Sequence, residues 1–236
     1  MMKNRVVVIS GATGSLGRVV TAYMAEQGAN LVLLGRSEAR LAKLVSELGL
    51  DITKNLSVAV DLNDPLAAQK AARATLKKFG KVDILLQLVG GWKGGQSIVD
   101  VNPDDVSTML QQHIWATFFL AQAFVPHLLK NEWGRIVAIS SPSSVKPQAK
   151  GGPYAIGKAA QEALMLTLAQ ELKGTGVTAN ILLVKTIDVT HQRELAPSVK
   201  NASWSTPEEI AEAILYLISD EARMVNGARL PLYGSP

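Results

Sequence analysis

Short runs of branched apolar residues alternate with longer stretches of helical period along almost the whole chain. This alternation is typical of βαβ units, in which a helix connects two parallel strands of one sheet. We expect strands near residues 5–10, 30–35, 56–60, 82–88, 134–140, 178–184 and 228–232. We expect helices near residues 15–28, 37–49, 65–79, 103–130, 153–173 and 207–219. The predicted fold class is α/β, with a doubly wound, seven-stranded and mainly parallel sheet and helices on both faces.

The composition is that of one globular domain. The 236 residues are 47% apolar but only 5% aromatic, so the core must consist mainly of Val, Leu, Ile and Ala, as in parallel sheets. The sequence contains no linker, internal repeat or low-complexity segment, and we therefore expect a single domain over residues 1–236. Loops that follow parallel strands build the ligand crevice of such sheets. These loops are expected at 90–102, 141–152 and 185–206.

The charge and the absence of cysteine exclude several classes of function. The net charge of +4 is spread along the chain without a basic block, which favours a small anionic ligand over nucleic acid. Without cysteine there are no disulfides, thiolate metal sites or cysteine nucleophiles, and we expect no metal and a cytoplasmic location. The apolar part of the N-terminus is too short for a signal peptide, and polar residues interrupt the longest apolar stretch, 114–129. We expect neither export nor a membrane span.

A glycine-rich turn follows the first predicted strand and precedes a helix. It contains Gly11, Thr13, Gly14, Ser15, Leu16 and Gly17. Glycines at such a turn permit positive φ and let the backbone approach a pyrophosphate, which the free amides of the helix N-terminus stabilise. The spacing is Gly-x-x-Gly-x-x-Gly instead of the usual Gly-x-Gly-x-x-Gly. A dinucleotide site and a purely structural turn are therefore both open from this motif alone.

Arg36 stands about 20 residues after the glycines, at the end of the second predicted strand. A carboxylate at this place binds the ribose diol of NAD, whereas an arginine binds the 2′-phosphate of NADP. The guanidinium of Arg36 is a planar fork suited to phosphate, and Gly35 leaves room beside it. This favours NADP(H) over NAD(H). The alternative is that Arg36 is a solvated cation at the start of the next helix.

Ser141, Tyr154 and Lys158 form a candidate catalytic set. Tyr154 and Lys158 share one face of a predicted helix, where an ammonium would favour the phenolate and lower the pKa of the phenol. Tyr154 could then act as proton donor. Ser141 follows a strand at the same edge of the sheet, where its hydroxyl could hold a substrate oxygen as negative charge develops. Taken alone, Tyr-x-x-x-Lys is common on helix surfaces.

Taken together, these motifs resemble the short-chain dehydrogenase/reductase family over essentially the whole chain. The matching positions are the glycine turn, Arg36, Asp61, Gly90, Ser141, Tyr154, Lys158, Asn180 and Ile187. The resemblance implies a Rossmann fold in which Asp61 and Leu62 flank the adenine. It further implies that Gly90 belongs to the cofactor site, that Lys158 also holds the nicotinamide ribose and that Ile187 lies near the carboxamide. Family members commonly form tetramers through two long helices, here near 103–130 and 153–173.

The chain departs from the family pattern at three places. The fourth strand usually ends Asn-Asn-Ala-Gly, but here only Gly90 is retained, and the following Gly-Gly-Trp-x-Gly-Gly segment resembles dihydropteridine reductase. His113 replaces an asparagine that helps to hold a water in the proton relay; it could carry protons itself or simply be a packed histidine. Val184-Lys185 replaces the usual Pro-Gly before the substrate lid, which we place at about 185–206. We expect Lys185 to be a solvated loop residue.

We expect an NADPH-dependent carbonyl reductase that is reversible as an alcohol dehydrogenase. Its catalytic residues are Ser141, Tyr154 and Lys158, with His113 in support, and Trp92 and Trp204 are expected at the walls of the substrate pocket. A dihydropteridine-like heterocycle reductase is the alternative within enzymes. A catalytically silent NADP(H)-binding sensor is the alternative from another class.

Overall fold

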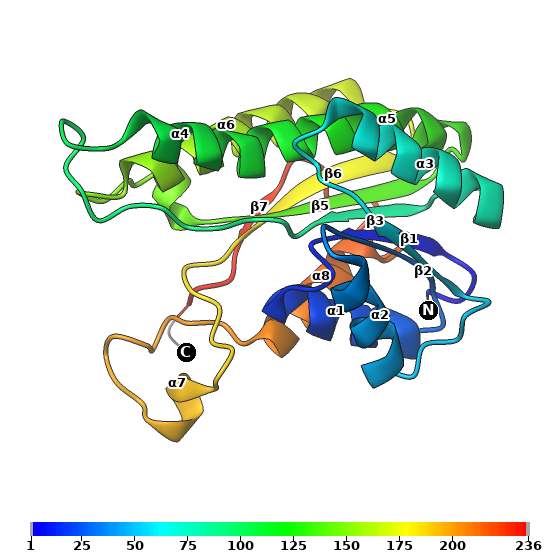
Figure 1. The fold of residues 1–236 in the computed structure, drawn as a ribbon, viewed down its shortest axis with the longest axis horizontal. Helices are drawn as coiled ribbons and strands as arrows, with labels where there is room; N and C mark the ends of the chain where they lie inside the picture. Colours follow the sequence, from blue (N-terminus) through cyan, green and yellow to red (C-terminus); the bar gives the residue numbers. More distant parts are fainter. Residues whose placement is uncertain (1, 235–236) are drawn as a thin grey trace.

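The computed structural model describes residues 2–234, and its centre is a seven-stranded sheet in which all neighbouring strands are parallel (Figure 1). The strands are β1 (Val6–Ser10), β2 (Asn30–Gly35), β3 (Asn55–Ala59), β4 (Ile84–Gln87), β5 (Gly134–Ser140), β6 (Val177–Leu183) and β7 (Arg229–Pro231). Their order in the sheet is β3-β2-β1-β4-β5-β6-β7. The order reverses between β1 and β4, as in a doubly wound fold. The predicted fold class is confirmed.

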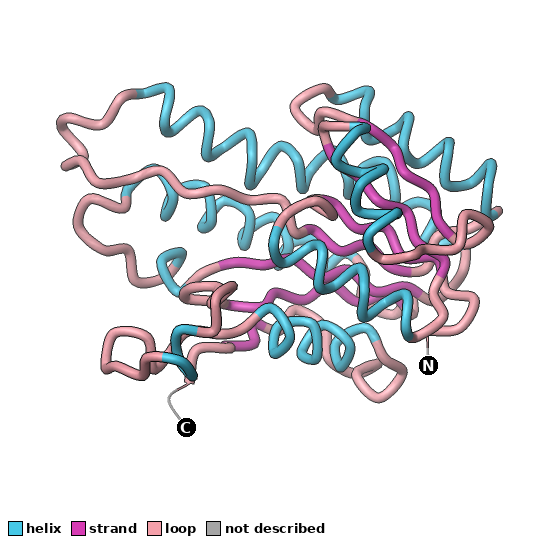
Figure 2. Tube along the Cα trace, turned by 60° about the horizontal axis from the view of Figure 1, so that its bottom comes forward, coloured by secondary structure: helices cyan, strands magenta, loops and turns pink. Residues whose placement is uncertain are grey.

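Helices cover both faces of the sheet (Figures 1 and 2). One face carries α1 (Ser15–Glu26), α2 (Glu38–Glu47) and α8 (Pro207–Ile218). The other side of the molecule holds α3 (Pro65–Phe79), α4 (Pro103–Leu110), α5 (Ala116–Lys130) and α6 (Gly152–Glu171). None of the helices among residues 2–234 is both long and apolar enough to cross a membrane.

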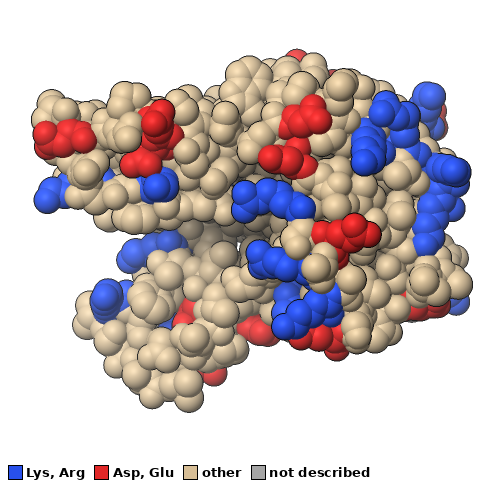
Figure 3. Space-filling view, viewed as in Figure 1, with Lys and Arg blue, Asp and Glu red and all other residues tan. Residues whose placement is uncertain are grey.

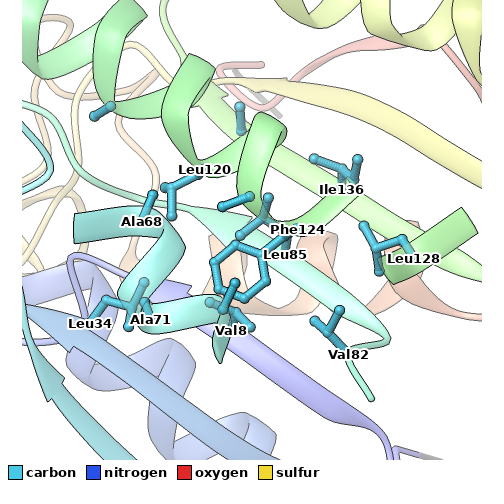
Figure 4. Packing of buried hydrophobic residues seen from close by; sticks show 14 of the residues in the cluster. Val8, Leu34, Ala68, Ala71, Val82, Leu85, Leu120, Phe124, Leu128 and Ile136 are labelled. Atoms are coloured by element: carbon cyan, nitrogen blue, oxygen red, sulfur yellow. The ribbon is translucent and has the colours of Figure 1, made fainter. Parts of the chain in front are cut away.

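Aliphatic and alanine side chains fill the two layers between the sheet and its helices, as the low aromatic content requires. On the α3 and α5 side, Phe124 is fully buried among Val8, Leu85 and Leu120 (Figure 4). Small residues of α3 let this helix approach the sheet closely, and Ala68 and Ala71 are fully buried there. The core is therefore close-packed with little aromatic volume.

The expected continuous helix over 103–130 is wrong in its middle. The structure has α4, then a π-helical turn over Gln111–Trp115, then α5. A π-turn inserts one residue into a helix and changes which side chains face inward, and such turns occur frequently at functional sites. Here the turn places His113 in the interior, where its side chain is fully buried.

The segment expected as an irregular lid contains a short helix, α7 (Gln192–Leu195). The carboxylate of Asp188 accepts hydrogen bonds from the backbone N–H groups of Gln192 and Arg193, both at 2.8 Å. Arg193 in turn bonds to the carbonyl of Trp204 and to the carboxylate of Glu209. A helix this short shows no hydrophobic period, and for this reason the sequence pattern did not indicate it.

The parallel arrangement brings the carboxyl ends of all strands to one edge of the sheet. Three segments leave this edge, at 88–102 after β4, 141–151 after β5 and 184–206 after β6. In Figure 1 the first two lie beside the start of α4 and α6, while the third carries α7 below them. Figure 3 shows a deep hollow between these two parts of the molecule. The site is expected in and behind this hollow.

Candidate active site

A cavity of about 490 Å³ lies at the carboxyl ends of β1, β2 and β4. Its lining includes Gly11, Thr13, Gly14, Gly35, Arg36, Arg40, Asp61, Leu62, Asn63, Gly90 and Gln112. Seven of these, Gly11, Thr13, Gly14, Arg36, Asp61, Leu62 and Gly90, are cofactor residues expected from the sequence. The structure thus brings together the glycine turn, the end of the second strand and the segment after the third.

The glycine turn packs closely against the segment after β4 and against the first turn of α1. Gly11 has a φ of +74°, and a Cβ on it would lie 3.0 Å from the backbone nitrogen of Val89. A Cβ on Gly17 would overlap the carbonyl oxygen of Gly11, so this glycine packs the helix against the turn. Ser15 and Leu16 form the first turn of α1, whose N-terminal amides point toward the cavity end of the helix. These features fit a pyrophosphate at the helix N-terminus.

Arg36 is exposed at the cavity and has a second cation beside it. Arg40, one helical turn later on α2, also lines the cavity and donates from Nη2 to the carbonyl oxygen of Thr13 at 2.9 Å. The acidic residue in the lining of this cavity is Asp61. Two guanidinium groups next to Ser37 make a suitable site for a phosphate group.

The structure places Ser141, Tyr154 and Lys158 together at the end of β5 and the start of α6. Ser141 lowers the pKa of the Tyr154 phenol, while its hydroxyl donates a hydrogen bond to the hydroxyl of Ser143 at 3.3 Å. Burial has a larger and opposite effect, so the pKa of Tyr154 is raised overall. The expected lowering of this pKa by Lys158 is not found for the chain by itself, because burial is the largest effect and Lys158 is not among the groups that shift the phenol.

Lys158 is held in a buried network of polar side chains. Its Nζ donates to the carbonyl oxygen of Ile139 at 2.7 Å and to Oε1 of Gln161 at 3.0 Å. The amide of Gln161 donates to the hydroxyl of Thr117 at 3.0 Å, and the amide of Gln87 reaches the same hydroxyl at 3.2 Å. Burial of the Lys158 ammonium lowers its pKa to about 7, and the charge of Glu162 opposes this shift. Lys158 therefore exchanges a proton near neutral pH.

His113 faces this network with one ring nitrogen unpaired. Nε2 lies 3.2 Å from the carbonyl oxygen of Gly91, which can only accept, so Nε2 carries the proton and Nδ1 is an acceptor. Nδ1 is buried and has no partner among the described residues. A Cβ on Gly90 would lie 3.6 Å from Nδ1 and 3.8 Å from Nζ of Lys158, so both nitrogens border the same glycine. Burial and the charge of Lys158 lower the pKa of His113 to about 3, which keeps the imidazole neutral.

Three expected site residues, Trp92, Trp204 and Ile187, belong neither to the lining of the large cavity nor to the set of Ser141, Tyr154 and Lys158. Trp92 is 64% exposed and lines a second cavity together with Tyr154. Trp204 is half-buried, and its carbonyl oxygen accepts from Arg193; it does not line the cavity that holds Trp92. Ile187 forms an isolated bridge with Ser205 and is not in the lining of the large cavity. Lys185 donates to the hydroxyl of Ser203 at 2.9 Å.

Comparison with known proteins decides the family. Residues 5–200 match the family model described as short chain dehydrogenase. The chain belongs to the short-chain dehydrogenase family. As a member of this family it is an oxidoreductase that binds a nucleotide cofactor, and the cavity with its glycine turn is the candidate place for that cofactor.

Relatives and a solved structure agree with the family. The chain is 27% identical over 228 residues to an uncharacterized oxidoreductase of Staphylococcus epidermidis, and 94% of each chain is covered. It is 26% identical over 219 residues to an uncharacterized oxidoreductase of Staphylococcus aureus, with 93% of each covered. The crystal structure of 3-ketoacyl-(acyl-carrier-protein) reductase from Brucella melitensis complexed with NADH superposes with a TM-score of 0.87. At 23% identity over 98% of both chains, this similarity shows the shared fold.

Sequence reasoning missed four residues of the candidate site: Arg40, Gln112, Gln161 and Thr117. Arg40 had a signal, because it stands four residues after Arg36 and therefore on the same side of the expected helix. Gln112 lines the cofactor cavity only because the π-turn rotates it there. Gln161 accepts a hydrogen bond from Lys158 and donates one to Thr117, which lies 44 positions away in the sequence. No local pattern indicates such long-range contacts.

Proposed function

We propose that this short-chain dehydrogenase is an NADPH-dependent reductase that converts a small carbonyl compound to an alcohol, and that the reaction is reversible. The observation that carries the proposal is the grouping of Ser141, Tyr154 and Lys158 beside the cofactor cavity. Of the cofactors, NADPH is favoured over NADH because Arg36 and Arg40 line one end of that cavity. The Brucella melitensis neighbour is a reductase of a ketone group, which is the same reaction class.

Ser141, Tyr154 and Lys158 have different roles in the proposed reaction. When bound, the nicotinamide cofactor supplies the hydride to the carbonyl carbon. The Ser141 hydroxyl donates a hydrogen bond to the carbonyl oxygen and stabilises the developing negative charge. Tyr154 gives its phenolic proton to that oxygen, and Lys158, which exchanges a proton near pH 7, restores the phenol. The lid over 185–206 and the Trp92 segment exclude water from the substrate.

The experiment that tests this proposal is NADPH oxidation across a panel of ketones and aldehydes, with NADPH binding measured in parallel. We expect binding and oxidation with at least one carbonyl compound. Binding without oxidation of any of them would instead favour the NADP(H)-binding sensor. Reduction of a quinonoid dihydropterin, with no activity on ketones, would favour the heterocycle reductase.

We also propose that His113 supports the proton relay. Its neutral Nδ1 can accept a hydrogen bond from Lys158, either directly or through a water, and such a bond favours the ammonium form of Lys158. Ammonium is the form that returns a proton to Tyr154 during reduction. The rate of carbonyl reduction should therefore fall as the pH rises through the pKa of Lys158, about 7.

Removing this acceptor should shift the pH profile in a defined direction. In His113→Ala the ammonium loses its acceptor, so the fall in kcat/KM should occur at a pH lower by roughly one unit, since a hydrogen bond to a charged group is worth about 1.5 kcal/mol. His113→Asn keeps an acceptor and should lie between this variant and the unmodified enzyme. The measurement is kcat/KM of the three proteins as a function of pH, from below 6 to above 8. Identical profiles for all three proteins would rule out the relay role and leave His113 as a packed residue.

An assembly through the long helices is proposed as well. The outer faces of the π-turn, α5 and α6 carry exposed apolar side chains, Trp115, Leu129 and Ile156. Exposed apolar residues on neighbouring helices are typical of protein–protein contacts. A homotetramer or homodimer would cover them.

A further inference from the structure

A second cavity, of about 260 Å³, adjoins the phenol of Tyr154. Its lining includes Trp92, Ser143, Gln148 and Lys150 and contains no acidic residue. The cavity faces the substrate side of the proposed reaction, because Tyr154 is the residue that gives its proton to the substrate. Its volume suits a single ring with short substituents. Figure 3 shows Lys and Arg side chains at the edges of the hollow between the two parts of the molecule.

The indole of Trp92 is held in an exposed position by the glycines around it. A Cβ on Gly94 would lie 2.8 Å from Cζ2 of Trp92 and 2.8 Å from the carbonyl oxygen of Lys150. Only glycine at this position lets the indole and that carbonyl come so close. Trp92 is nevertheless 64% exposed, which is unusual for so large an aromatic side chain. The exposed indole is therefore free to contact a ligand in the cavity that it lines.

Lys150 is fixed to the same segment. Its carbonyl oxygen accepts a hydrogen bond from the backbone nitrogen of Gly95 at 2.7 Å, which joins the loop after β4 to the loop after β5. Its φ is +64°, a conformation that costs energy for a residue other than glycine and that is concentrated at ligand sites. Within residues 2–234, Lys150 forms no ion pair. Its positive charge is available to a ligand.

We infer that the substrate is a planar aryl carbonyl compound that carries a carboxylate. The inference rests on the proposed carbonyl reduction and specifies its substrate class. The aryl ring stacks on the indole of Trp92, the carboxylate pairs with the ammonium of Lys150, and the carbonyl lies at the hydroxyls of Ser141 and Tyr154. Gln148 offers a further hydrogen bond to the carboxylate.

Four methyl ketones distinguish the effect of the aromatic ring on kcat/KM from the effect of the carboxylate. They are acetophenone, cyclohexyl methyl ketone, and the 4-carboxylate of each. We expect 4-acetylbenzoate to have the highest kcat/KM, roughly tenfold above its saturated analogue and roughly threefold above acetophenone, since an exposed ion pair contributes less than aromatic stacking. Conjugation makes an aryl ketone intrinsically less electrophilic, so a preference for the aryl ring must come from the pocket.

Two variants assign the preferences to residues. Trp92→Leu should remove the ring preference and keep the charge preference, whereas Lys150→Gln should do the reverse; Trp92→Phe should retain most of the ring preference. Matched controls are Tyr216→Leu, an exposed aromatic residue on α8 that lines neither cavity, and Lys146→Gln, an exposed lysine of the same loop as Lys150 that does not line the cavity. Neither control variant should change the order of kcat/KM among the four ketones. All four positions are exposed, so these variants should fold.

The outcomes separate this inference from the proposed function. If no ketone in any panel is reduced, the proposed function fails. If ketones are reduced without the two preferences, or if the preferences survive in Trp92→Leu and Lys150→Gln, the aryl carboxylate class is wrong while the carbonyl reductase stands. Loss of both preferences together in either control variant would also overturn the assignment to this cavity.

Discussion

A Tyr154→Phe variant should bind NADPH as tightly as the unmodified enzyme and should reduce its carbonyl substrate roughly a thousandfold more slowly. The substitution removes one oxygen and leaves the ring. This oxygen borders Ser141, which lowers its pKa, and it carries the proton that the proposed reaction consumes. The ring also packs edge-to-face against His113, with the centres 5.6 Å apart, and phenylalanine preserves that contact.

The measurement is a single turnover, in which enzyme is mixed with NADPH and substrate and the nicotinamide absorbance is followed. Cofactor affinity is measured separately by titration. Tyr216→Phe is the matched control, because Tyr216 is a half-exposed tyrosine on α8 outside both cavities. A Tyr154→Phe enzyme that retains more than about a tenth of the rate would refute the proton-donor role.

The fold could be predicted from the sequence because its signals are local and repeated. Each strand and each long helix is indicated by its own period, and the glycine turn lies between the first strand and the first helix as expected. The π-turn could not be predicted, because residues 111–115 fit an α-helical period equally well. What distinguishes the turn is the burial of His113 against the segment after β4, which is a tertiary contact.

The pKa values of the candidate site, like the π-turn, depend on tertiary contacts that the sequence pattern does not reveal. Spacing alone places Tyr154 and Lys158 on one helix face, and the structure agrees with that placement. Spacing does not reveal that both groups are withdrawn from water, so it gave the wrong direction for the pKa of the phenol. Burial depends on the packing of β5, α5 and α6 around the pair. The lysine, with a pKa of about 7, is the group that titrates near neutrality.

Replacement of the two cavity arginines should reduce the preference for NADPH strongly and leave NADH nearly unaffected. Arg36→Gln should weaken NADPH binding roughly thirtyfold, because a hydrogen bond between charged groups is worth about 2 kcal/mol. Combined with Arg40→Gln, the loss should reach at least about a hundredfold. NADH lacks the 2′-phosphate, so its affinity should change by no more than about twofold.

The reason for this asymmetry lies in the position of the two guanidinium groups. Arg36, Ser37 and Arg40 line the cavity together with Asp61 and Leu62, the residues expected at the adenine. Glutamine keeps most of the side-chain length, so the effect reports the charge. Arg18→Gln is the matched control, because Arg18 is a nearby cation that is paired with Glu47 and does not line the cavity.

Binding constants for both cofactors, measured with each variant over a range of salt concentrations, give the decisive comparison. The salt dependence of NADPH binding should decrease with each arginine removed, since each removes a charge contact with a phosphate. An equal loss for NADPH and NADH would mean that the arginines act on the shared part of the cofactor or on the fold. A tighter binding of NADH by the unmodified enzyme would overturn the NADPH assignment, because Arg36 and Arg40 would then not be contributing a contact to a 2′-phosphate.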